Sequence, residues 1–243
     1  MMSMKKKTWC FYLILAGFAM TINGVHAQES QDKSMTESED VDKVKIVNQI
    51  PEGILLDMST EELIQAYIES RFTGLILAYD NPQDGFNRVY EDFSGLRELL
   101  NRDDIGIKLV TYYQGMDPGL YDPNWEPSRI GKFTFKFIFI EVLIAQERIL
   151  ERLTHSEVKL LLSELLKKNE LKTRYCEKHS ILGLSINAFA ITRLIELKGK
   201  QSGFSLEFLQ EPGMDYLLKT GRLRNDRILP ALIQKAQEFL QSY

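Results

Sequence analysis

The sequence has little that could support metal, nucleotide or covalent catalysis. It contains two cysteines and three histidines in 243 residues. No His-Glu-x-x-His helix, no Gly-x-x-x-x-Gly-Lys loop and no Gly-x-Gly-x-x-Gly turn occurs, and the segment 183–187 (GLSIN) lacks the second glycine of a nucleophile elbow. These absences disfavour zinc proteolysis, phosphate cradling and Rossmann-type cofactor binding. We therefore predict no catalytic residue, no cofactor and no metal site, and the sequence leans away from an enzyme without deciding the question.

The N-terminus has the pattern of a secretory signal peptide. Three lysines at 5–7 precede an apolar stretch at 10–20, and Val25-His26-Ala27 ends in the small residue that signal peptidase accepts. The apolar stretch is too short for a membrane anchor, which is the alternative interpretation. We predict a signal peptide at 1–27 and a mature chain that begins at Gln28, has no transmembrane anchor, and is exported to the periplasm, the cell surface or the medium.

Export changes both the charge and the cysteine count. The full chain has 30 basic and 34 acidic residues, and removal of the three lysines at 5–7 leaves 27 basic against 34 acidic, a net charge of −7. An acidic protein is a poor partner for nucleic acid, because phosphate binding depends on Lys and Arg. Only Cys176 remains in the mature chain, so an intramolecular disulfide is excluded, while pairing of Cys176 between two chains stays open.

The mature chain is predicted to have two parts. Residues 28–43 (QESQDKSMTESEDVDK) carry almost no apolar side chain, which predicts a disordered acidic tether. Residues 44–243 form a single predicted domain. Within it, residues 128–153 (SRIGKFTFKFIFIEVLIAQERILERL) are apolar on nearly every face, which predicts a central core helix surrounded by other elements. Apolar and polar residues alternate at 133–137, which also suits a strand, but the apolar pattern continues through residue 153, and this length favours one helix.

Helix signals recur along the rest of the domain. Two capping boxes, at 59–62 (STEE) and 154–157 (THSE), predict helix starts, and Asn81 with Pro82 predicts a third. A second nearly all-apolar helix is predicted at 180–197, ending at Gly199. We predict an all-α fold around these two apolar helices. It is either an irregular helical bundle or a HEAT/armadillo-like stack of helix pairs, an alternative suggested by the similar segments 96–100 (LRELL) and 162–166 (LSELL).

One resemblance accompanies these patterns. The stretch STEELIQAYIESRF at 59–72, together with DFSGLRELLNRDD at 92–104, resembles exported helical bacterial proteins of uncharacterised activity. The resemblance implies secretion and a helical fold. It implies no activity, because neither stretch matches a catalytic motif.

The best candidate for ligand contact is a loop rich in proline and aromatic residues. It contains Asp117, Tyr121, Asp122, Trp125 and Glu126. Aromatic faces beside carboxylates suit sugar rings, and the carboxylates could also hold Ca²⁺, although the spacing is not that of an EF-hand. The alternative is that the two aromatic residues attach the loop to the core.

The last candidates are a thiol and imidazoles. Cys176 and His179 are three residues apart, close enough for a two-ligand metal site or for Cys–His catalysis, but no neighbouring residue completes either set. His155 lies in the first turn of a capped helix and is expected to be solvated. The sequence as a whole predicts an exported, non-enzymatic helical interaction protein that binds a protein or glycan partner. The alternative is a carboxylate-dependent hydrolase acting on extracellular polysaccharide.

Overall fold

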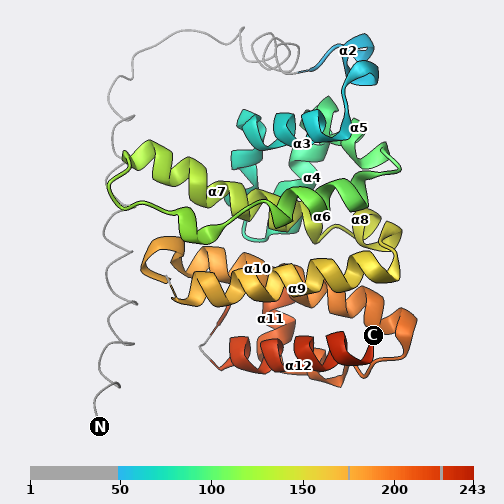
Figure 1. Cartoon of the computed structure of the whole chain (residues 1–243), viewed down its shortest axis with the longest axis vertical. Coiled ribbons are helices and arrows are strands. Elements are labelled where there is room, and N and C mark those ends of the chain that lie inside the picture. Colours follow the sequence, from blue (N-terminus) through green and yellow to red (C-terminus); the bar gives the residue numbers. More distant parts are fainter. Residues whose placement is uncertain (1–48, 175, 225–226) are drawn as a thin grey trace, which may run out of the picture. The chain divides into compact units, whose positions relative to one another are not determined.

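The computed structural model describes residues 49–174, 176–224 and 227–243, except for the side chains of 176–178. They belong to one compact unit, 48–243. The predicted signal peptide and the predicted tether lie outside the described residues. The described part of the chain consists of helices and connections without a strand, so the all-α prediction is confirmed (Figure 1).

The helices of this part follow one another with short connections. In chain order they are α2 (Glu52–Asp57), α3 (Thr60–Glu69), the 3₁₀ helix η2 (Arg71–Leu77), α4 (Pro82–Asp92), α5 (Ser94–Asn101), α6 (Ile105–Gln114), η3 (Pro118–Leu120), α7 (Pro127–Ile144), α8 (Glu147–Arg152), α9 (His155–Arg174), α10 (Cys176–Ser202), η4 (Glu207–Gln210), α11 (Pro212–Thr220) and α12 (Ile228–Ser242). α10 packs against α7, α8, α9, α11 and α12, and α3 packs against α5 and α6. This arrangement is consistent with either a helical bundle or a stack.

The capping signals lie where the sequence predicts them. Ser59 accepts a hydrogen bond from the backbone N–H of Glu62, and the Glu62 carboxylate accepts from the N–H of Ser59. Thr154 and Glu157 form the same reciprocal pair at the start of α9. The Asn81 side chain accepts from Asp84 N–H at the start of α4. Such caps satisfy backbone donors that a helix start would otherwise leave unpaired.

The central stretch is helical, but the prediction of one helix through residue 153 is wrong. α7 ends at Ile144, and Gln146 adopts an extended conformation (φ −74°, ψ 131°) before α8 begins. The Gln146 side-chain amide donates to the carbonyl of Val142 at 2.7 Å, taking an acceptor that a continuing helix would use for a backbone N–H. The break bends the chain while both helices stay in the core.

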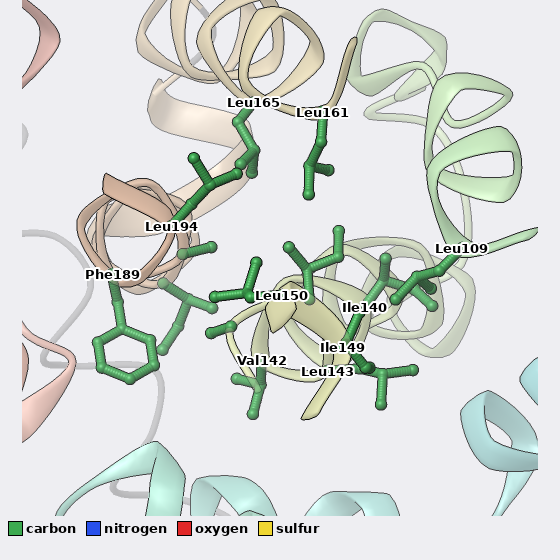
Figure 2. Packing of buried hydrophobic residues seen from close by; sticks show 14 of the residues in the cluster. Leu109, Ile140, Val142, Leu143, Ile149, Leu150, Leu161, Leu165, Phe189 and Leu194 are labelled. Carbon is green, nitrogen blue, oxygen red and sulfur yellow. The ribbon is translucent and has the colours of Figure 1, made fainter. Parts of the chain in front are cut away.

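The core gathers around this break. Figure 2 shows side chains of α7 and α8 at the centre, with leucines of α9 above them, Leu109 of α6 on one side and Phe189 and Leu194 of α10 on the other. The labelled residues are Leu109, Ile140, Val142, Leu143, Ile149, Leu150, Leu161, Leu165, Phe189 and Leu194, and all of them are buried. Burying a side chain of this size contributes about 1.5–3 kcal/mol each, so the fold can hold without a disulfide.

The second apolar helix is longer than predicted. α10 continues past Gly199 to Ser202, and the chain turns at Gly203, whose φ of +76° favours glycine. Near its start, Ser180 has a non-helical conformation (φ 57°, ψ 161°), which kinks the helix. Among the described residues, His179–Ser202 is one helix that could cross a membrane by length and composition alone. However, 67% of its apolar window is buried inside the fold, as in the core helix of a soluble protein.

Candidate functional site

The carboxylates of the predicted ligand loop stabilise the loop itself. The Asp117 side chain accepts a hydrogen bond from Gly119 N–H at 2.8 Å, at the start of η3. Asp122 accepts from the N–H of Asn124 at 2.9 Å. Glu126 is exposed at the N-cap position of α7, where its side chain makes no capping bond. The structure thus places Asp117 and Asp122 in local turns, where one oxygen of each carboxylate accepts a hydrogen bond from a neighbouring backbone N–H.

The aromatic residues of the same loop pack onto α7. The rings of Tyr121 and Trp125 are 6.3 Å apart, and the Trp125 ring meets Phe133 edge-on at 5.2 Å. The guanidinium of Arg129 lies 4.2 Å from the Trp125 ring centre. Both loop aromatics are half-buried. These contacts fit the alternative interpretation, in which Tyr121 and Trp125 attach the loop to the core, while ligand contact at this loop stays a prediction.

His179 is part of the same contact and is buried. Its Nε2 lies 2.9 Å from the carbonyl oxygen of Pro118, and its ring packs against Phe137 at 5.9 Å. The side chain of Cys176 lies outside the described residues, so the Cys–His hypothesis stays a prediction. His155 is exposed and stacks on Tyr243 at 4.4 Å. No group of three or more His, Cys, Asp or Glu side chains suited to a metal ion occurs among the residues that were described.

A groove of about 740 Å³ runs between α9 and α12. Its apolar lining includes Leu166, Leu229 and Ile233, and its polar lining includes Lys167, Glu170, Arg174, Gln234 and Gln237. Two helices that run beside each other with apolar side chains between them form the kind of surface that receives a third helix. The groove was not anticipated from the sequence, because no local pattern shows that α9 and α12 lie beside each other.

A second, charged hollow of about 640 Å³ lies where α3, α5 and α6 meet. Four carboxylates line it, from Glu61, Glu98, Asp103 and Asp104. Most of them have partners, because Lys108 Nζ is 2.6 Å from Glu61, Arg102 Nε is 3.0 Å from Glu98, and the Thr60 hydroxyl donates to Asp104. The hydrogen bond from Lys108 lowers the pKa of Glu61, which makes Glu61 a poorer general acid.

The most closely connected polar cluster is sealed inside the fold. Glu141 from α7 is 0% exposed, and its Oε1 and Oε2 lie 2.6 and 2.7 Å from Nζ of Lys172 on α9. Tyr113 from α6 donates its hydroxyl to Glu141 Oε1 at 2.6 Å, and Asn187 Nδ2 from α10 donates to the same oxygen at 3.0 Å. Asn169 Nδ2 donates to Asn187 Oδ1 at 2.8 Å. Four helices thus meet at one carboxylate.

Burial and charge together set the protonation of this cluster. Removal from water lowers the pKa of Lys172, and the Glu141 carboxylate opposes that shift. Burial, followed by the neighbouring Glu141 charge, raises the pKa of Tyr113 well above its ordinary value. Lys172 Nζ also lies 5.1 Å from the ring centre of Phe137, so the surroundings are aromatic as well as dry.

Sequence reasoning missed this cluster. Lys168 of α9 is also buried, although a lysine on an amphipathic helix usually lies on the exposed face. Its Nζ is 2.7 Å from Glu164 and 4.4 Å from the Tyr113 ring centre, so an ion pair and an aromatic face replace water. The available signal was Glu141, a lone acid inside the most apolar stretch of the chain. A buried acid needs a partner, but the sequence does not say which residue supplies it.

Comparison with known proteins gives no match from which a role for these sites could be transferred. The chain matches no protein-family profile, no curated protein and no solved structure.

Proposed function

We propose that this protein is an exported, non-enzymatic interaction protein that binds a protein partner in the groove between α9 and α12. The observation that carries the proposal is the lining of that groove. Leu166, Leu229 and Ile233 offer apolar surface, while Lys167 and Glu170 provide charges of both signs at the same site. An amphipathic helix of the partner would bury its apolar stripe between the two helices and place its polar edges beside these charges.

Export is part of the proposal and is supported by the sequence of residues 1–27. The mature protein would begin at Gln28 and carry residues 28–43 as an acidic tether ahead of the helical domain. N-terminal sequencing of the protein recovered outside the cytoplasm tests this step. A first residue of Gln28 supports it, and a retained Met1 contradicts it.

A photo-crosslinking amino acid at Gln237, which lines the groove, tests the site of binding. We expect one discrete adduct when cells that make the protein are irradiated. The adduct should disappear when Ile233→Asp is added, because a charge would then face the apolar side of the partner. Gln241→Asp is the matched control, since Gln241 is exposed on the same helix and does not line the groove.

The purified partner identified in this way then completes the test. Ile233→Asp should weaken its Kd at least tenfold, about 1.4 kcal/mol, while Gln241→Asp should leave the Kd unchanged. An adduct that survives Ile233→Asp, or a Kd that does not respond to it, overturns the assignment to the groove. A glycan array distinguishes the other partner class, since glycan binding that is lost on Trp125→Ala would assign recognition to the 117–126 loop instead.

The hydrolase alternative has a defined place to be tested. The hollow lined by Glu61, Glu98, Asp103 and Asp104 contains the carboxylates that such chemistry needs. Lys108 and Arg102 neutralise two of them, which makes the hollow a weaker basis for a function than the groove. Release of reducing sugar from extracellular polysaccharide by the wild type, and its loss in Asp103→Asn, would establish the alternative.

A further inference from the structure

The buried cluster contains the complete set of groups needed to form an amide bond between two side chains. Lys172 Nζ and Asn187 Nδ2 lie 2.6 and 3.0 Å from the same atom, Glu141 Oε1. One carboxylate oxygen therefore holds an amine and a carboxamide side by side. All three residues are fully buried, so water does not compete for either group.

We propose that Lys172 and Asn187 join spontaneously in an intramolecular isopeptide bond, with Glu141 as the catalytic proton shuttle. Lys172 is the nucleophile, and the side-chain carbonyl carbon of Asn187 is the electrophile. The bond would link α9 to α10 covalently, without any cofactor, oxidant or second protein.

The surroundings favour each part of this reaction. A lysine attacks only as the neutral amine, and burial favours the neutral form of Lys172, whose proton Glu141 is placed to accept. The negative charge that develops on Asn187 Oδ1 meets the side-chain amide of Asn169, whose Nδ2 already donates to that oxygen at 2.8 Å. A donor held in place before the reaction stabilises such a charge without reorganisation.

The step balances in atoms and charge. Lys172 transfers one proton to Glu141, and the Nζ lone pair then attacks Cγ of Asn187. The tetrahedral intermediate passes a proton from Nζ to the carboxylate, while Glu141 protonates Nδ2. The Cγ–Nδ2 bond breaks and ammonia leaves. One proton remains on the new amide nitrogen, three leave in ammonia, and the last stays on Glu141 as a neutral carboxylic acid, so no unpaired charge is left in the core.

Such a bond has a clear use in this chain. The mature protein would have one cysteine and so no internal disulfide. A covalent link between residues 172 and 187 would tie α9 to α10, as a disulfide often does between the elements of a secreted protein.

Mass spectrometry of the full chain tests the proposal. The wild type should be lighter than its sequence mass by about 17 Da, the mass of the one ammonia displaced by the lysine nucleophile. Trypsin should then release residues 169–174 joined to residues 179–193, because an acylated Lys172 is no longer cleaved. The joined peptide is the decisive observation, since cyclisation of an N-terminal Gln28, or of Asn187 on its own, also loses ammonia but links no peptides.

Matched variants locate the chemistry. Lys172→Met and Glu141→Gln should both abolish the joined peptide, and Glu141→Gln retains the size of the side chain. Lys168→Met is the control, because Lys168 is also buried on α9 but pairs with Glu164, so a joined peptide should persist, now as residues 168–174 linked to 179–193 because trypsin no longer cleaves after residue 168. Circular dichroism confirms that each variant is folded.

The wild type alone can decide the question if a variant fails to fold. Quantitative recovery of separate peptides 169–172 and 179–193 from folded wild-type protein overturns the proposal. So does a joined peptide that is lighter by the mass of water, which would assign the bond to Glu141 instead of Asn187, or one that persists in Glu141→Gln.

Discussion

Substitution of the buried ion pair gives the sharpest test of how the core is held together. Lys172→Met keeps the length of the side chain and removes its charge. Glu141 is 0% exposed, so, compared with the unreacted chain in which Lys172 is a free amine, this change leaves a carboxylate in the core without its cation. Breaking a buried pair on one side costs about 3–5 kcal/mol, a large share of the roughly 5–15 kcal/mol by which domains are stable.

The double variant Lys172→Met with Glu141→Leu separates the orphaned charge from the lost contact. Both variants lack the Lys172 amine, and hence any bond it makes, so the difference between them reports the unpaired carboxylate. We expect the double variant to regain about 2 kcal/mol of the loss. Recovery is partial because the Tyr113 hydroxyl loses Glu141 as its acceptor. Asn187 Nδ2 adds little to the loss, since it still donates to the Leu165 carbonyl at 3.3 Å.

Urea unfolding at pH 7, followed by circular dichroism, measures both free energies of unfolding. The midpoint should fall in the single variant and rise again in the double, with the slope unchanged. Lys219→Met is the control, because Lys219 pairs with Asp215 on the exposed surface and should leave the midpoint where it is. Equal destabilisation of the single and double variants would refute the reasoning, since the cost would then come from lost packing and not from a stranded charge.

Three further predictions follow from local geometry. Burial raises the pKa of Tyr113 well above its ordinary value, so the folded chain keeps this proton while the unfolded chain loses it above about pH 10. The free energy of unfolding therefore falls as pH rises beyond that point. Tyr113→Phe should make it fall less steeply between pH 10 and about 12, by about 1.4 kcal/mol per pH unit, in urea unfolding, and an unchanged slope would contradict this. Gly85→Ala should lower the thermal midpoint because its Cβ would lie 2.5 Å from the backbone Cα of Ile76, whereas Gly53→Ala meets nothing and should leave the midpoint unchanged or slightly raised, so similar effects would contradict the prediction. Ser59→Ala should cost about 1 kcal/mol in chemical unfolding through loss of the cap, and a Ser59→Asp variant with the same loss would show that capping is not the cause.

The local part of the fold could be predicted from the sequence. The capping boxes at 59–62 and 154–157 and the Asn81 cap are confirmed, because a cap joins residues that are near neighbours in the chain. The all-α class is confirmed for the same reason, since helix hydrogen bonds are local. The break at Gln146 was missed because periodicity alone does not reveal that the Gln146 side chain takes the Val142 carbonyl as its acceptor, in competition with the helix backbone.

The candidate sites depend on tertiary contacts that no local pattern encodes. The 117–126 loop could be recognised as irregular and aromatic, but only the fold places Arg129 over Trp125 and the loop against Phe133. The groove between α9 and α12 is lined by residues of two helices that are distant in the sequence and come together only in the fold.

By itself the sequence determined that the described part of the chain is helical, where α3, α4 and α9 begin, and that an apolar segment lies at its centre, because these properties arise from hydrogen bonds and periodicity over a few residues. Only the tertiary structure decided that Glu141, Lys172 and Asn187 meet, although each is visible in the sequence. A buried charge needs a partner, and which side chain supplies it is decided when separate helices pack together.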